Sequence, residues 1–250
     1  GSVERGTLLV TVSAWLPARV VSVTPTTPHA RVLMLDVPGW PGNLPGQHLD
    51  VRLTAEDGYQ AERSYSLASS GVGARVELAV DEIPDGEVSP YLVREVRAGD
   101  ELEVKGPLGA YFVWRADDPS PVQLIAGGSG VVPLVAIARA RIAASASVSP
   151  MRLLYSVRSA GDALYAEEIS AFEDRGVTTT WVYTRTAPDG WNGRTGRVDA
   201  DLLADAVWSP SMNPLIFVCG PTGFVEAVAD ALVASGHDPG RVRTERFGGS

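Results

Sequence analysis

Four adjacent residues, Arg63-Ser64-Tyr65-Ser66, combine an arginine with an aromatic ring and two hydroxyl groups. The planar fork of an arginine grips phosphate with two hydrogen bonds, so Arg63 is a candidate anion ligand. The segment is predicted to be a strand, on which alternation puts Arg63 and Tyr65 on one face and the two serines on the other. A half-exposed strand with a surface arginine explains the same residues, so both interpretations stay open.

Two glycine-containing segments downstream could bring backbone amides to a ligand. Gly86-Glu87-Val88-Ser89 precedes a predicted helix, and a helix N-terminus attracts phosphate. Ser89 as a plain N-cap would explain that serine without any ligand. Gly106-Pro107-Leu108-Gly109 allows close backbone approach, although an ordinary turn uses the same residue types.

Two further glycine turns each follow an apolar segment that predicts a buried strand. Gly127-Gly128-Ser129-Gly130 lacks the full GxGxxG spacing, but its amides can face a dinucleotide with no side chain in the way. Cys219-Gly220-Pro221 would end a strand at the carboxyl edge of a sheet, where such folds bind ligands. The alternative for Cys219 is a small buried hydrophobic residue.

The elements that must position these motifs differ between the two halves of the chain. Short β-branched segments in the first half predict a six-stranded antiparallel Greek-key β-barrel, capped by one helix at residues 89–96. The predicted strands are residues 18–24, 30–36, 48–53, 65–69, 75–80 and 101–105. We assign this domain to residues 1–118.

The second half changes to continuous apolar strands that alternate with helical segments. This βαβα series predicts an α/β domain with an open, doubly wound parallel sheet, which we assign to residues 119–250. The predicted strands are residues 122–126, 152–156, 178–183 and 215–219, and the predicted helices are residues 131–144, 164–174, 198–204 and 223–235.

The composition narrows the partners and the cofactor. A net charge of -9 repels phosphate backbones and anionic lipid, so neither nucleic acid nor a membrane is expected. The single cysteine cannot form an internal disulfide, a structural zinc site or a four-thiolate cluster, and the histidines have no metal-ligand spacing. No metal is expected, and redox chemistry would need an organic cofactor. The chain opens with Gly1-Ser2, an apparent cleavage scar, and no signal peptide or membrane span is predicted, which favours the cytoplasm.

Taken in order, these motifs and the C-terminal Glu245-Arg246-Phe247-Gly248 resemble the ferredoxin-NADP reductase superfamily, from about residue 15 to the end of the chain. The resemblance implies a flavin-binding barrel followed by a nicotinamide-nucleotide domain, which agrees with the two domains predicted from periodicity. It also implies FAD as the cofactor, with FMN as the rival.

The resemblance gives the motifs of the barrel their roles. Arg63 would bind the flavin phosphates, Tyr65 would lie against the isoalloxazine ring and Ser66 would lie near its N5 atom. The segment around Val88 would hold the pyrophosphate. The implied cofactor-binding residues are Arg63, Ser64, Tyr65, Ser66, Gly86, Val88, Ser89 and Phe247.

The implied catalytic residues come from both domains: Ser66, Cys219, Glu245 and Phe247. Phe247 would screen the flavin ring until nicotinamide displaces it, which requires residues 248–250 to swing clear. A simple hydrophobic plug is the alternative for this terminus. The implied nucleotide-binding residues are Gly127, Gly128, Ser129, Gly130, Arg158, Thr184, Arg185, Cys219, Gly220 and Pro221.

Two arginines at predicted strand ends bear on the choice of coenzyme. Thr184-Arg185 resembles the Ser-Arg pair that NADP-using members place on the 2′-phosphate, and Arg158 ends the preceding strand. NADPH is therefore expected to outperform NADH, which stays possible. The alternative is that both arginines are solvated and pair with the nearby Asp162 and Asp189.

The resulting hypothesis is an FAD-dependent NAD(P)H reductase that accepts a hydride and passes single electrons to a separate protein, such as a ferredoxin serving an oxygenase or a cytochrome P450. One cysteine cannot supply an iron-sulfur domain, so the electrons must leave for another molecule. Direct reduction of a partner oxygenase, or of a small acceptor such as free flavin or quinone, stays open. So does a nucleotide-binding electron-transfer subunit without turnover. A monomer is expected.

Overall fold

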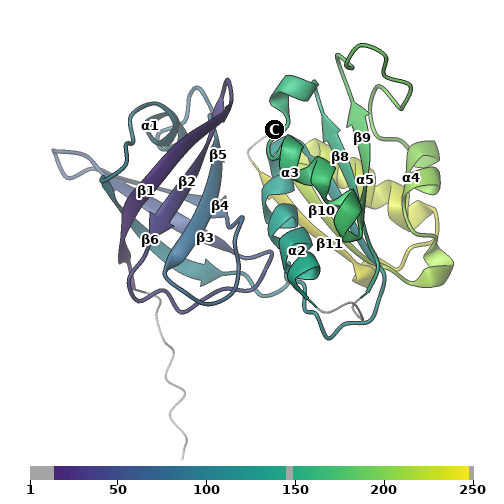
Figure 1. Cartoon of the computed structure of the whole chain (residues 1–250), viewed down its shortest axis with the longest axis horizontal. Coiled ribbons are helices and arrows are strands. Elements are labelled where there is room, and N and C mark those ends of the chain that lie inside the picture. The colour runs from purple at the N-terminus through teal and green to yellow at the C-terminus, as the bar shows by residue number, and fades with distance from the viewer. Residues whose placement is uncertain (1–13, 145–148, 248–250) are drawn as a thin grey trace, which may run out of the picture.

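The computed structural model of the protein describes residues 14–144 and 149–247. It contains a six-stranded antiparallel sheet followed along the chain by a five-stranded parallel sheet, and the two stand side by side (Figure 1). The predicted order, a barrel and then a doubly wound α/β domain, is confirmed.

The barrel pairs strands that are distant in sequence, in the order β4-β3-β6-β1-β2-β5. It closes where Leu67, just after β4, bridges Leu78 on β5. Inward-facing residues such as Val20, Leu33 and Leu49 are fully buried and form its core. The elements are β1 (Leu16–Thr27), β2 (Ala30–Asp36), β3 (His48–Thr54), β4 (Gln60–Ser66), β5 (Arg75–Asp81), α1 (Ser89–Arg94) and β6 (Glu101–Leu108).

Two predicted details of the barrel are wrong. The fourth strand was expected at residues 65–69 but is Gln60–Ser66, a polar strand without apolar alternation whose bounds are set by its pairing with β3. Residues 67–69 instead cross over to β5. Ser89 is not the N-cap of α1, because Val88 holds that position and Ser89 Oγ accepts a hydrogen bond from the Ile83 amide at 2.9 Å.

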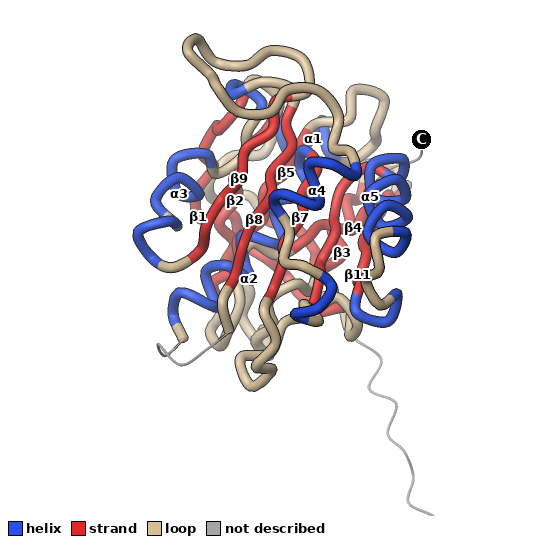
Figure 2. The backbone as a smooth tube through the Cα atoms, turned by 90° about the vertical axis from the view of Figure 1, so that its right-hand side faces the viewer, coloured by secondary structure: helices blue, strands red, loops and turns tan. Residues whose placement is uncertain are grey.

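The parallel sheet has the order β11-β10-β7-β8-β9. Helices α2 and α3 cover one face and α4 and α5 cover the other (Figure 2). The elements are β7 (Val122–Gly127), α2 (Val131–Ala143), β8 (Met151–Val157), α3 (Ala166–Ala171), β9 (Val177–Tyr183), α4 (Ala200–Ala206), β10 (Leu215–Pro221), α5 (Thr222–Ala234) and β11 (Val242–Phe247). Short 3-10 helices are η1 (Gly128–Gly130), η2 (Ala160–Asp162), η3 (Glu173–Arg175), η4 (Pro210–Met212) and η5 (Pro239–Arg241).

Sequence analysis missed strand β11. It pairs only with β10 at the edge of the sheet, and its sequence VRTERF carries charged residues that a buried central strand would not tolerate. This edge strand brings Glu245 and Phe247 to the carboxyl end of the sheet. The C-terminal motif is thus part of the sheet up to Phe247, while its last residue, Gly248, lies outside the described residues.

The two domains also contact each other through side chains. Phe112, in the linker between β6 and β7, meets Phe217 of β10 edge-on, with ring centroids 5.2 Å apart. Trp114 of the same linker and Ala79 of the barrel join the cluster on that face of the sheet. The predicted boundary at residue 118 falls in this linker and stays a prediction. None of the described helices is long and apolar enough to cross a membrane.

Candidate functional site

A cleft of about 460 Å³ lies where the barrel meets the second domain. The barrel lines it with the ends of β4 and β5 and with the segment 81–89. The second domain contributes Ser129 and Val132 from the start of α2 and Phe247 from the end of β11. Segments that are far apart in the sequence, and that the motifs single out, therefore share one cavity.

Arg63 lies in the cleft wall with its charge already partnered. It donates to the carbonyl oxygen of Glu62 at 2.6 Å, and its guanidinium lies 3.7 Å from the Glu87 carboxylate. The Arg63 and Glu87 side chains are each 50% exposed, so water screens the pair and it contributes little to stability. A bound phosphate can therefore replace Glu87 as the partner of Arg63.

The three residues after Arg63 all line the cleft, although alternation predicted opposite faces. Ser64 Oγ donates to Asp50 Oδ1 of β3 at 2.6 Å. Tyr65 packs against the barrel core, and burial raises the pKa of its hydroxyl group. The Ser66 hydroxyl is buried and has no hydrogen-bond partner among the described residues. An unpaired buried hydroxyl group is costly, and a polar ligand atom in the cleft can pair with the Ser66 hydroxyl.

The segment 81–89 offers backbone groups to the cleft. A Cβ atom on Gly86 would lie 3.0 Å from the Ile83 carbonyl oxygen, so this turn is tight. Val88 is fully buried, and the Ser89 hydroxyl is occupied by the Ile83 amide. The contribution of Gly86, Val88 and Ser89 to a ligand would thus come from the main chain.

Sequence analysis did not assign the carboxylates of this segment to the site. Asp81, Glu82 and Asp85 line the cleft, and Glu82 pairs with Arg94 at 2.5 Å. Burial raises the pKa of Asp81. These acids oppose an anionic ligand, and the acid-rich run beside the predicted phosphate segment was the signal that could have found them.

The glycine turn after β7 is packed on one side and open on the other. A Cβ atom on Gly130 would lie 2.1 Å from the Cys219 carbonyl oxygen, and one on Gly127 would lie 2.8 Å from the Phe224 ring. Gly128 has a φ of +54° and nothing within 4 Å of the position of a Cβ atom. Only glycine meets these conditions, and the open side gives a ligand access to the backbone.

Gly220 and Pro221 end the strand that packs against this turn. A Cβ atom on Gly220 would lie 3.0 Å from the Gly127 carbonyl oxygen, so the two glycine segments are in close contact. Pro221 is exposed and is the N-cap of α5. The two motifs that sequence analysis assigned to one nucleotide are therefore neighbours.

Cys219 and Glu245 face each other across the paired strands β10 and β11. Neither residue lines the cleft. Cys219 is fully buried, and burial raises the pKa of its thiol well above its usual value, with the Glu245 charge adding to this. Burial also raises the pKa of Glu245 to about 7. Core packing accounts for Cys219 as well as a nicotinamide contact does.

The strand-end residues predicted to choose the coenzyme lie outside this cleft, at the ends of β8 and β9. The amide of Arg185 donates to the carbonyl oxygen of Arg158 at 3.0 Å, which ties the two strand ends together. Both arginine side chains are exposed. Among the described residues, neither arginine forms an ion pair with Asp162 or Asp189, and Asp162 accepts a hydrogen bond from Ser159 Oγ at 2.8 Å. Thr184 is half-buried beside them.

Two family models match the chain, one for each domain. The oxidoreductase FAD-binding domain matches residues 17–113, which include the barrel. The oxidoreductase NAD-binding domain matches residues 124–230, which include the glycine turn and most of the parallel sheet. The cofactor classes implied by the resemblance are thereby confirmed.

Two curated relatives and one solved structure are similar to this chain over most of its length. The toluate 1,2-dioxygenase electron transfer component of Pseudomonas putida is 28% identical over 83% of this chain, which spans 59% of that protein. NADH-cytochrome b5 reductase 1 of Aspergillus terreus is 30% identical over 78% of this chain and 68% of its own length. The FAD/NAD-binding domain of a nitric oxide dioxygenase from Vibrio cholerae superposes with a TM-score of 0.82 at 26% identity, covering 94% of this chain and 99% of that one. The chain therefore belongs to the ferredoxin-NADP reductase superfamily of flavin- and nicotinamide-dependent oxidoreductases.

Proposed function

We propose that this chain is an FAD-containing NAD(P)H reductase that delivers electrons to a separate protein. One observation carries the proposal: residues of the FAD-binding barrel and of the NAD-binding domain line the same cleft, and the buried Ser66 hydroxyl in its wall has no partner in the part of the chain that the structure describes. Two ring systems bound by the two domains would meet in this cleft.

The barrel wall fits a flavin. Tyr65 offers a half-buried aromatic face, and Ser66 offers a hydroxyl group without a partner among the described residues. Arg63 offers a half-exposed charge whose ion pair with Glu87 is screened by water. The backbone of residues 86–89 would take the pyrophosphate. Bound FAD would accept a hydride and release the electrons one at a time.

The wall from the second domain fits a nicotinamide. Gly128, next to the cleft-lining Ser129, leaves the backbone open, and Phe247 would cover the flavin until the nicotinamide takes its place. The Glu245 carboxyl, with a pKa of about 7, would hold or release a proton close to the reacting rings. Cys219 would support the nicotinamide from behind the wall.

The preference for NADPH is also part of the proposal. Arg185 and Arg158 are exposed at adjacent strand ends, so their guanidinium groups are available to a 2′-phosphate, and Thr184 would add a hydroxyl group. NADH would bind without these contacts.

The proposed acceptor is a ferredoxin or an oxygenase component. The Pseudomonas putida relative is by name the electron transfer component of a dioxygenase, which supports an acceptor of this class. The expected cytoplasmic location and monomeric state are parts of the same proposal.

The test is an anaerobic titration of the purified protein. We expect acid release to yield one FAD per chain, and we expect NADPH to bleach the flavin before any acceptor is added. Electrons should then pass faster to a ferredoxin or oxygenase component than to free FMN or a quinone. Recovery of FMN alone would change the cofactor assignment, and a bound flavin that no nicotinamide nucleotide reduces would exclude the proposed reaction.

A further inference from the structure

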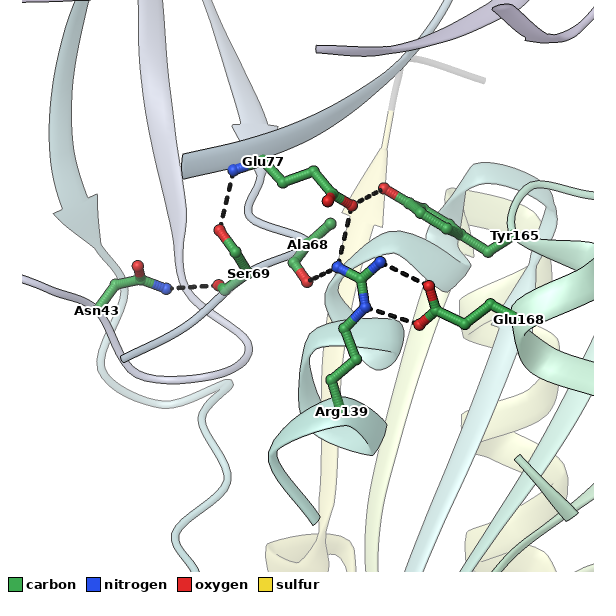
Figure 3. A network of polar contacts seen from close by, with 7 residues as sticks. All are labelled: Asn43, Ala68, Ser69, Glu77, Arg139, Tyr165 and Glu168. Atoms are coloured by element: carbon green, nitrogen blue, oxygen red, sulfur yellow. Dashed lines mark hydrogen bonds and ion pairs between the residues drawn. The ribbon is translucent and has the colours of Figure 1, made fainter. Parts of the chain in front are cut away.

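A polar cluster joins the two domains at a second place, away from the cleft. Its centre is Arg139 of α2, whose side chain reaches across the domain boundary to the barrel (Figure 3). Arg139 Nη1 donates to the carbonyl oxygen of Ala68 at 2.9 Å and to Glu77 Oε2 at 3.0 Å. From its own domain, Glu168 of α3 bonds to the same guanidinium, so a single side chain connects α2, α3 and the barrel.

Within its own domain, the Arg139 guanidinium is held by the carboxylate of Glu168. Arg139 Nε and Nη2 each donate to a Glu168 carboxylate oxygen at 2.7 Å, which is a bidentate pair. The Arg139 side chain is 30% exposed and the Glu77 side chain 12% exposed, so water screens this cluster far less than the Arg63 contact. Burial alone would lower the pKa of Arg139, but its bonds to Glu168 and Glu77 raise it, and the residue stays charged.

Tyr165 reinforces the same bridge. Its hydroxyl group donates to Glu77 Oε2 at 2.6 Å, so Glu77 accepts from two residues of the other domain. Tyr165 has a φ of +56°, in the left-handed region that favours glycine. This backbone conformation is costly for a residue with a side chain, so the contacts of Tyr165, its bond to Glu77 among them, must offset that cost.

On the barrel side, the bridge grips the segment that leaves the flavin-binding strand. Ala68 lies two residues after Ser66, and its amide donates to the carbonyl oxygen of Glu77 at 2.9 Å. The next residue, Ser69, accepts from the Glu77 amide at 2.9 Å through Oγ, and Asn43 donates to its carbonyl oxygen at 2.8 Å. The end of β4 is thus fixed relative to β5.

On the other side, the bridge grips the helix that begins at the glycine turn. Val132, which lines the cleft, and Arg139 are seven residues apart on α2 and so lie on the same face, about 10 Å apart along the helix axis. A helix transmits a shift at one end to the other. A shift of Arg139 relative to the barrel would therefore also move Ser129 and Val132 relative to Ser66.

We infer that Arg139 is a positioning residue for hydride transfer, which clamps the segment after Ser66 to α2 and so sets the gap between the two walls of the cleft. The inference rests on the proposed function, because the gap matters only if the nicotinamide and flavin rings meet there. Hydride transfer needs the reacting atoms within ~3 to 3.5 Å, and a misplacement of about 1 Å can slow such a step by about a hundredfold.

The test compares Arg139→Gln with Arg141→Gln in the flavin-loaded protein. Arg141 lies on the same helix, but its Nε donates to Ser149 of its own domain at 2.8 Å and does not reach the barrel. We expect the rate constant of flavin reduction at saturating NAD(P)H to fall about 10- to 100-fold in Arg139→Gln, with flavin content and nucleotide affinity changed less than about threefold. The Arg141→Gln protein should behave as the wild type.

A second readout is independent of activity. Cys219 is buried and is the single cysteine of the chain, so spin labels will attach to cysteines introduced at exposed Val72 of the barrel and Val233 of α5. The distance distribution between these labels should broaden or shift in Arg139→Gln and stay as in the wild type in Arg141→Gln.

An Arg139→Gln protein with the distance distribution of the wild type would overturn the clamp, whatever its rate, and so would a changed distribution with an unchanged rate. A wild-type flavin that NAD(P)H does not reduce would instead contradict the proposed function, and the label distances would still decide whether Arg139 fixes the domains. If Arg139→Gln does not fold, Tyr165→Phe removes one bond of the bridge without leaving a buried charge. In Tyr165→Phe we expect flavin reduction to slow about threefold and the label distances to change less than in Arg139→Gln. Wild-type values of both the rate and the distances would overturn the positioning role of Arg139.

Discussion

The two walls of the cleft are built in opposite ways. The barrel wall presents side chains that already have partners, such as Arg63 beside Glu87 and Ser64 bonded to Asp50. The wall from the NAD-binding domain includes Ser129 of the glycine turn, and the neighbouring Gly127 and Gly130 have no room for a side chain against Phe224 and Cys219.

This difference predicts how strongly substitutions in each wall should change affinity, activity and stability. Exposed or half-exposed pairs in water contribute about 0 to 1 kcal/mol, so changes on the barrel wall should tune affinity in small steps. Backbone atoms in tight contact cannot move apart without disturbing the fold, so substitutions at the glycine turn should cause large losses of stability and activity. The predictions below test this contrast, beginning with the largest expected effect.

Gly130→Ala should have the largest effect. The added Cβ atom would lie 2.1 Å from the Cys219 carbonyl oxygen and 2.4 Å from its carbonyl carbon, so the turn and β10 must separate. We expect the free energy of unfolding to fall by about 3 kcal/mol and NAD(P)H-dependent flavin reduction to drop at least a hundredfold. Urea denaturation and anaerobic stopped-flow absorbance measure the two effects.

Gly223→Ala is the matched control for this change. It lies in the first turn of α5, where a Cβ atom would meet nothing within 4 Å, so stability and rate should stay near those of the wild type. Equal losses in the two variants would show that the close contact at Gly130 does not explain the requirement for glycine.

Arg185→Ala should have the next largest effect, and only with one coenzyme. A charge-assisted bond to the 2′-phosphate is worth ~1.5 to 3 kcal/mol, so kcat/KM for NADPH should fall roughly ten- to a hundredfold while kcat/KM for NADH stays nearly constant. Arg175→Ala, an exposed arginine near the opposite end of β9, is the control. A wild type that prefers NADH would contradict the assignment of Arg185.

The glycine turn after β7 was also the part of the site that could be predicted best from the sequence. Strands with continuous apolar runs, such as β7, and the glycine turn after it depend on local sequence, and both were found. Strand β11 was missed because it is a charged edge strand, and β4 was misplaced because its mostly polar residues show no apolar alternation. The local sequence pattern does not determine where these two strands begin and end, because their pairing with distant strands sets their bounds.

The contacts between domains could not be predicted for a different reason. Arg139 finds Ala68 and Glu77 at separations of 71 and 62 residues, and nothing in α2 distinguishes this arginine from Arg141 on the same helix. Likewise, the unpaired state of the Ser66 hydroxyl is a property of the folded barrel. Sequence indicated which residues could bind a ligand, and only the fold indicates which of them still lack a partner.

Glu245 should make stability depend on pH. Its pKa is raised from 4.5 to about 7 in the folded protein, so it favours folding fully below about pH 4.5 and loses that contribution as the pH rises to 7 and above. After allowance for solvent screening, we expect about 2 kcal/mol between pH 5 and pH 8. Urea unfolding at both pH values should show this slope in the wild type and lack it in Glu245→Gln. Glu226→Gln, on exposed α5 surface, should keep the slope, and a wild type without it would refute the burial of this charge.

Ser66→Ala should separate stability from chemistry. The hydroxyl is buried without a partner in the protein alone, so its removal should leave the flavin-free protein as stable as the wild type or slightly more stable. Flavin reduction by NADPH should nevertheless slow by roughly tenfold, because the polar contact near the reacting ring is lost. Ser64→Ala, which removes the bond to Asp50, is the control and should not slow this step. A loss of stability in flavin-free Ser66→Ala would mean that the hydroxyl has a partner inside the protein.

Glu87→Gln should produce the smallest effect, and in the direction of tighter binding. Glu87 shares Arg63 at 3.7 Å and lines a cleft that already holds Asp81, Glu82 and Asp85, so its charge opposes the pyrophosphate. Removing it frees Arg63 and lowers the repulsion, but both side chains are half exposed, which limits the gain to about 0.5 to 1 kcal/mol or a two- to fivefold lower Kd for FAD. Titration of the flavin-free protein, followed by FAD fluorescence, measures this Kd. Glu62→Gln is the matched control, because Glu62 holds Arg63 only through its backbone carbonyl oxygen. If Glu87→Gln instead bound FAD more weakly, Glu87 would be needed to orient Arg63. The side chains of the barrel wall would then be held in place for the ligand as firmly as the backbone of the glycine turn.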